Sequence, residues 1–142
     1  MADWREWTLD RGMQPPVTFV GEFIISNDGV SGTSLWNSLV GGGRWHAISV
    51  FRTQEGRHVV YISYRSKVKG ELENREVFWC DHASDVPTVL NQYQEVAMPV
   101  IAERLLIAPD KRQRAALDIL ARYQRQVAAI LAGIPGIQFK LS

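Results

Sequence analysis

The stretch "GRWHAISVFRTQEGRHVVYISYRSKVK", residues 43–69, decides the fold because it predicts a two-stranded β-hairpin. Gln54, Glu55 and Gly56 provide the turn, with Gly56 in the left-handed position of a bulge-type loop. Thr53 then pairs with Arg57, and the same register continues outward along both strands.

This register separates the hairpin into two distinct faces. One face carries His46, Ile48, Val50 and Arg52 against Tyr64, Ile62, Val60 and His58. The other carries Trp45, Ala47, Ser49 and Phe51 against Arg65, Ser63, Tyr61 and Val59. Because a slip by one residue would mix the two faces, the apolar pattern itself favours this pairing.

The segments around the hairpin predict an α+β domain: an antiparallel sheet of about four strands within residues 17–82, packed on two C-terminal helices. Residues 17–26 and 73–82 are the flanking strands. Residues 83–107 and 111–132 have the periodicity of helices. The apolar hairpin face should pack on these helices, whose half of the core is supplied by Leu120, Tyr123, Val127 and Leu131.

The 142 residues suit a single domain, with a lead-in at 1–16, a strand-rich part at 17–82, a helical part at 83–133 and a tail or edge strand at 134–142. In the lead-in, the spacing of Trp4 and Trp7 permits a short helical turn. Pro99 should kink or split the first helix, and Asp110 should cap the second. Residues 33–40 fit either a strand or a short helix.

Composition points to a globular protein of the cytoplasm. Apolar residues make up 46% and charged residues 22% of the chain, and Cys80 is the one cysteine, so no intrachain disulfide can form. The N-terminus has no apolar segment of a secretory signal, and no run approaches the ~20 apolar residues of a membrane helix. We therefore expect a cytoplasmic protein without a membrane segment.

Charge is unevenly distributed although the net charge is only +1. Residues 44–69 carry six basic and one acidic side chain, and residues 111–142 carry the same numbers. On the second hairpin face, aromatic rings stand among cations, a combination that suits single-stranded nucleic acid because rings stack on bases and cations follow phosphates. The predicted binding residues are Trp45, Phe51, Arg57, Tyr61, Arg65, Lys67 and Lys69. On the second predicted helix, Arg114, Arg122 and Arg125 can share a face and also touch phosphates.

Two alternatives to nucleic-acid binding remain open. The aromatic face of the hairpin could instead pack beneath the C-terminal helices, with the arginines at its rim. The chain could also be a protein-interaction or regulatory module, including a homodimer in which basic residues 111–125 meet acidic residues 70–81 of a second copy.

No catalytic or cofactor motif is present, so we expect a protein that is not an enzyme and holds no cofactor or metal. Cys80 and His82 point to the same side of a strand, too far apart for an easy thiolate–imidazole pair. There is no C-x-x-C or H-x-x-x-H spacing for a metal. The carboxylates Glu71, Glu73, Glu76 and Asp81, which Glu22 could join, fit an acidic edge that discourages strand pairing.

Overall fold

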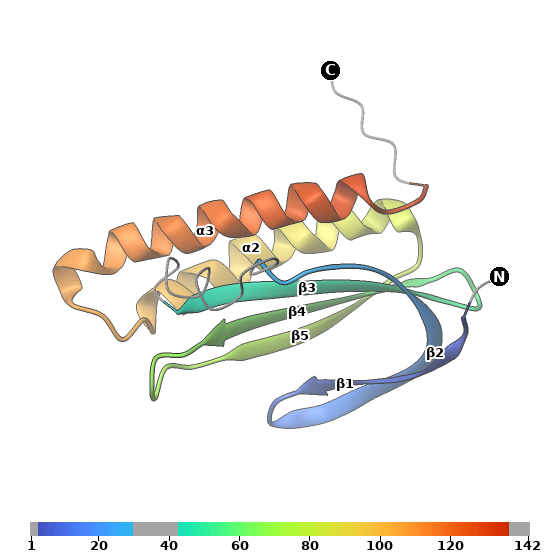
Figure 1. The fold of residues 1–142 in the computed structure, drawn as a ribbon, viewed down its shortest axis with the longest axis horizontal. Coiled ribbons are helices and arrows are strands. Elements are labelled where there is room, and N and C mark those ends of the chain that lie inside the picture. Colours follow the sequence, from blue (N-terminus) through green and yellow to red (C-terminus); the bar gives the residue numbers. More distant parts are fainter. Residues whose placement is uncertain (1–2, 30–42, 137–142) are drawn as a thin grey trace, which may run out of the picture.

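The computed structural model describes residues 3–29 and 43–136. A curled antiparallel sheet forms one layer and two helices form the other (Figure 1). The strands follow one another in chain order and are β1 (Arg5–Arg11), β2 (Gln14–Asn27), β3 (Arg44–Thr53), β4 (His58–Ser66) and β5 (Asn74–Cys80). A 3-10 turn, η1 (Ala83–Asp85), leads into α2 (Val86–Glu103), and α3 (Pro109–Ala132) follows.

The α+β prediction is therefore confirmed. Strands β2 to β5 correspond to the predicted sheet of about four strands, and β1 is an additional strand that precedes them in the chain. The β3–β4 register is also the predicted one: Thr53 N–H donates to the Arg57 carbonyl at 2.8 Å, and Gly56 has φ +86°. Ile48 faces Ile62 and Val50 faces Val60, all fully buried.

The first residues of the chain differ from the prediction. Residues 5–11 are a strand, so the helical turn expected around Trp4 and Trp7 is wrong. Pairing with β2 satisfies the backbone of this segment, and the Trp7 indole N–H donates to the Gly21 carbonyl at 2.9 Å. Trp7 reaches the body of the protein from a strand and packs on Phe51, with ring centroids 4.8 Å apart.

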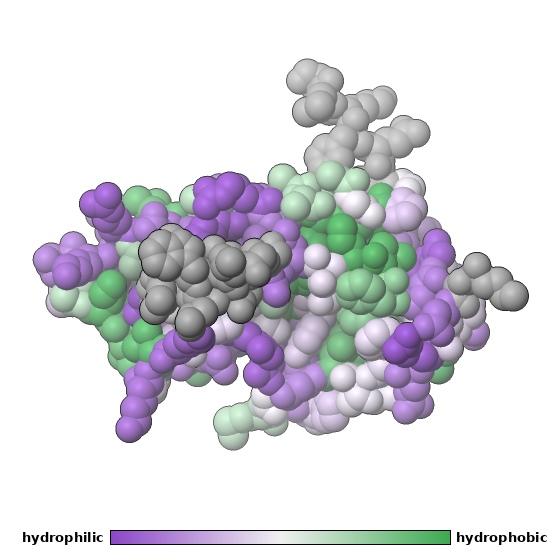
Figure 2. Space-filling model, in the orientation of Figure 1, coloured by the Kyte–Doolittle hydropathy of each residue, from purple (hydrophilic) through white to green (hydrophobic). Residues whose placement is uncertain are grey.

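A β-bulge in β2 allows that strand to serve both faces of the sheet. Phe23 pairs with Phe51, but Ile25 pairs with Val50, so the register shifts between them. Without the extra residue Phe23 and Ile25 would lie on one face, because side chains alternate. With it, Phe23 joins the aromatic cluster, and Ile25 packs toward α3 near Gly133. Figure 2 shows hydrophobic residues gathered on this face where the C-terminal end of α3 lies in Figure 1.

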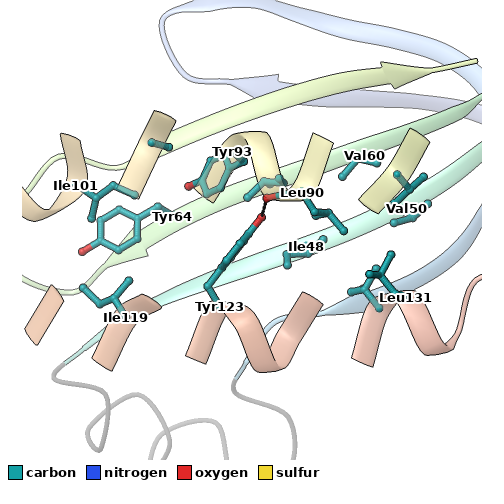
Figure 3. Packing of buried hydrophobic residues seen from close by; sticks show 14 of the residues in the cluster. Ile48, Val50, Val60, Tyr64, Leu90, Tyr93, Ile101, Ile119, Tyr123 and Leu131 are labelled. Atoms are coloured by element: carbon teal, nitrogen blue, oxygen red, sulfur yellow. Dashed lines mark hydrogen bonds between the residues drawn. The ribbon is translucent and has the colours of Figure 1, made fainter. Parts of the chain in front are cut away.

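The main core lies between the sheet and the helices. Tyr64, Tyr93 and Tyr123 are at most 1% exposed and lie among aliphatic residues of both layers (Figure 3). The Tyr123 hydroxyl donates to the Leu90 carbonyl at 2.7 Å, so the buried phenol keeps a partner. Tyr123 and Leu131 occupy the core as predicted and Val127 packs against it, whereas Leu120 lines a groove between the helices.

The helix boundaries correct two expectations. Helix α2 continues past Pro99 to Glu103, because Pro99 lies on the exposed side, where water can bind the carbonyl that loses its partner. Helix α3 begins two residues earlier than expected, with Ala108 instead of Asp110 as N-cap and with Pro109 in its first turn. The segments 33–40 and 137–141 lie outside the described residues.

A second, smaller core forms on the other face of the sheet, because the sheet curls and β1 approaches β5. Leu9, Phe19, Phe51 and Val59 are buried there.

In the part of the chain that the structure describes, neither helix has the length and apolar character needed to cross a membrane.

Candidate nucleic-acid interface

The turn end of the β3–β4 hairpin does not offer the predicted stacking surface. Phe51 is 3% exposed and packs against the rings of Trp7, Phe19 and Phe23. The reason is the curl of the sheet: β1 and β2 cover this part of the face, not the C-terminal helices. The Phe51 ring is thus closed to a nucleic-acid base.

Arg57 also belongs to the turn end. Its Nε donates to Asp81 Oδ1 at 3.1 Å, and its guanidinium lies over the Trp79 ring, 5.0 Å from the centroid. Arg57 and Arg65 stand near opposite ends of β4, eight residues apart, which corresponds to roughly 26 Å of extended chain. The structure therefore separates Arg57 from the other predicted phosphate contacts.

Tyr61 occupies the middle of the face and is half-buried. Its hydroxyl donates to the Asp10 carbonyl, and the Asp10 carboxylate forms an ion pair with Arg75. These contacts join β1 to β4 and β5. Tyr61 thus helps to close the curl, and only part of its ring remains accessible.

The open end of the hairpin keeps the other predicted residues together. Trp45 is half-buried and lies opposite exposed Arg65. Lys67 N–H donates to the Gly43 carbonyl at 2.8 Å, which places Lys67 beside the start of β3, and exposed Lys69 follows in the next turn. Arg65 makes no ion pair within residues 3–29 and 43–136.

The second basic segment of the chain arrives at the same place. Arg122 of α3 donates from Nη1 to the Arg44 carbonyl at 3.0 Å, and Arg125 is one turn further along the helix. We call the side chains around the first residues of β3 the basic corner: Trp45, Arg65, Lys67, Arg122 and Arg125. Among the described residues, β2 ends its pairing at Ile48, so β3 has no partner strand on this edge from Arg44 to Ala47.

Arg44 itself is taken out of this surface by a buried ion pair. Its guanidinium donates to both oxygens of Glu71, with Nε at 2.8 Å from Oε1, and the two side chains are 7% and 1% exposed. Tyr64 Oη and the Leu106 N–H also donate to this carboxylate. Burial alone would raise the pKa of Glu71, but these hydrogen bonds outweigh it and hold the pKa at about 2.

The predicted acidic edge is consequently wrong for Glu71, which is an interior residue. Glu22 does not join the carboxylates of β5 either, because it pairs with Arg52 across the β2–β3 ladder. Glu73 accepts from the Ser66 N–H at 3.1 Å and Glu76 accepts from Asn74 at 3.1 Å. Most of the acidic segment is thus engaged within the fold.

The two residues considered for catalysis, Cys80 and His82, differ in their exposure to solvent. Cys80 is 2% exposed, and burial, followed by the charges of Asp85 and Asp81, raises the pKa of its thiol to about 11. His82 is exposed, with its backbone N–H bonded to Asp85. Across the described ranges, no three histidine, cysteine or carboxylate side chains are grouped closely enough to hold a metal ion.

Comparisons with known proteins return no relative from which a function could be taken. No protein-family model, no curated protein and no solved structure matches the chain significantly.

Proposed function

We propose that this chain is a cytoplasmic, non-enzymatic protein that binds nucleic acid at the basic corner, with single strands preferred over duplexes. The observation that carries the proposal is the meeting of two basic segments, residues 44–69 and 111–142, fixed by the hydrogen bond from Arg122 to the carbonyl of Arg44, 78 residues earlier in the chain. Their cations lie on both sides of a strand edge. A flexible phosphate backbone can follow such an edge, and each phosphate contact releases counterions.

The preference for single strands rests on Trp45. An indole ring stacks only on a base whose face is free, and such stacking contributes ~1–3 kcal/mol per base. Phe51, Tyr61 and Arg57, which the sequence suggested, have no major part in this interface because of their packing. The proposed contacts are therefore Trp45 for a base, with Arg65, Lys67, neighbouring Lys69, Arg122 and Arg125 for phosphates.

The test uses two arginines near opposite ends of β4, Arg57 just before the strand and Arg65 near its end. Anisotropy of a labelled single-stranded oligonucleotide is titrated at about 50 and 200 mM salt with wild type, Arg65→Ala and Arg57→Ala. Both variants lose one positive charge, but only Arg65 belongs to the basic corner. We expect weaker binding and a salt slope reduced by about 0.7 for Arg65→Ala, and near wild-type behaviour for Arg57→Ala.

Two results would contradict the proposal. One is an absence of binding at both salt concentrations. The other is an equal loss of affinity in the two variants, which would indicate a general effect of net charge and not a defined site.

A second candidate function, homodimer formation, is favoured by the exposed surface of α2. Val96 is 64% and Val100 43% exposed, and Leu117 of α3 is 58% exposed. A hollow of about 180 Å³ lies beside Val96 and Val100, between α2 and the β4–β5 turn, and another of about 320 Å³ lies beside Leu117, between α2 and α3. Protruding apolar side chains thus lie next to recesses, a combination that suits a self-complementary two-fold interface. This arrangement favours an apolar dimer over the docking of residues 111–125 on residues 70–81, whose carboxylates are largely engaged.

Sedimentation at low and high salt distinguishes these dimers. An apolar dimer should persist at 500 mM salt and dissociate in Val96→Asp, whereas a dimer held by charge should dissociate with salt alone. A monomer under both conditions would remove this second candidate.

A further inference from the structure

A hollow of about 180 Å³ lies between the end of β2 and α3. Its walls are formed by side chains and backbone of both elements: Asn27, Gly29, Arg122, Arg125 and Gln126. Every wall residue that the structure describes is neutral or positively charged. Asp28 precedes Gly29 in the chain but does not line the hollow.

Hydrogen bonds hold the neutral wall in place. Gln126 is 6% exposed, and its Nε2 donates to the carbonyls of His46 at 2.7 Å and Asn27 at 3.2 Å. Asn27 Oδ1 accepts from the Gly29 N–H at 2.9 Å, and Gly29 has φ +67°. A Cβ at Gly29 would lie 3.1 Å from Gln126 Nε2, so a larger residue would strain the turn and press on the Gln126 amide.

The positive wall consists of two arginines in an unfavourable pair. Arg122 is half-buried, and burial followed by the neighbouring charge of Arg125 lowers its pKa, with Asp118 offsetting only part of this. The bond to the Arg44 carbonyl orients the Arg122 guanidinium and uses one of its five N–H donors. The remaining donors of Arg122 and those of exposed Arg125 are suited to an anion with several acceptor oxygens.

Charge and shape together select the kind of anion. A phosphomonoester carries about −1.5 to −2 charges and three terminal oxygens, which matches two guanidinium groups, whereas an internal phosphodiester carries one charge and two free oxygens. We propose that the hollow binds a terminal phosphomonoester, and hence that the protein recognises the phosphorylated end of a bound strand. The second half of this proposal rests on the proposed nucleic-acid function, but the first half does not.

The experiment compares strands of one sequence that carry a phosphate at the 5′ end, at the 3′ end or at neither end, with the dye attached internally. One additional set of charge-assisted hydrogen bonds should make one of the phosphorylated strands bind about tenfold more tightly. Arg125→Gln should abolish this difference. Arg114→Gln, an exposed arginine three turns earlier on α3, should retain it, and so should Arg65→Ala, although with weaker binding overall.

A second readout is independent of nucleic acid. Methyl phosphate is titrated into labelled protein while the arginine Nε–H signals are followed by NMR. Saturable shifts of the Arg122 and Arg125 signals, absent for methyl sulfonate of lower charge and absent in Arg125→Gln, are expected.

The outcomes separate the two proposals. Binding of all strands with equal affinity and no response to methyl phosphate would overturn the phosphate site and leave the nucleic-acid function standing. A response to methyl phosphate without binding of any strand would overturn the nucleic-acid function and support the phosphate site. If neither probe binds, both proposals are wrong.

Discussion

The two ends of the β3–β4 hairpin are held by different forces. At the turn end, Phe51 and Val59 are buried in an apolar cluster, and Arg57 forms an ion pair with Asp81 at the surface. At the open end, the buried pair of Arg44 and Glu71 ties β3 to the β4–β5 turn and to the segment after α2. Arginine thus has two different roles at the two ends of one hairpin, a surface ion pair at the turn end and a buried ion pair at the open end.

The largest expected effect is at the open end. Glu71→Ala should lower the free energy of unfolding by about 3–5 kcal/mol, because it leaves the Arg44 guanidinium buried without its partner. Glu73→Ala is the matched control, since exposed Glu73 accepts a bond from the Ser66 N–H and should cost well under half as much. Urea unfolding measures both. Similar losses would show that the buried pair does not anchor this end.

At the turn end, Phe51→Leu should cost about 1–3 kcal/mol. Leucine fills most of the space but loses the ring contacts with Trp7, Phe19 and Phe23. Trp45→Leu, at the open end, should cost less, because Trp45 makes no aromatic ring contact within the described ranges, yet it should weaken oligonucleotide binding. The comparison fails if Trp45→Leu destabilises the protein more than Phe51→Leu.

The open end should also be sensitive to acid. Burial, followed by the charge of Arg122, lowers the pKa of His46 to about 3, so below pH 6.5 the unfolded state binds a proton that the folded state does not. Stability should therefore fall by about 1 kcal/mol between pH 7 and 5.5. Below the ordinary carboxyl pKa, protonation of Glu71 in the unfolded state adds to this loss until the pH reaches about 2.

Urea midpoints at pH 7, 5.5 and 4 measure this dependence. Phe51→Leu should lower all three by a similar amount, whereas His46→Gln should flatten the loss between pH 7 and 5.5. A wild-type stability that is constant from pH 7 to 4 would contradict both assignments.

The register of the hairpin was predictable because the alternation of side chains between two faces and the turn at Gly56 are both local features of the sequence. The burial of Phe51 was not, since it depends on β1 and on a bulge in β2 that no short pattern specifies. The Arg44–Glu71 pair did leave a signal. Arg44 is an even number of residues from Ile48 and Val50, so it lies on the same face of the strand, the face predicted to meet the helices. A buried arginine requires a carboxylate partner. The choice of Glu71 from several carboxylates required the folded chain.

The smallest expected effect is the surface pair at the turn end. Asp81→Ala should change the free energy of unfolding by less than about 1 kcal/mol, because both partners are substantially exposed and salt screens their attraction. Arg57 also keeps its position over the Trp79 ring. A double-mutant cycle of Arg57→Ala and Asp81→Ala at low and high salt isolates their coupling. A coupling above 2 kcal/mol that resists salt would show that ion pairs anchor both ends of the hairpin, and the contrast between the ends would then lie only in their apolar packing.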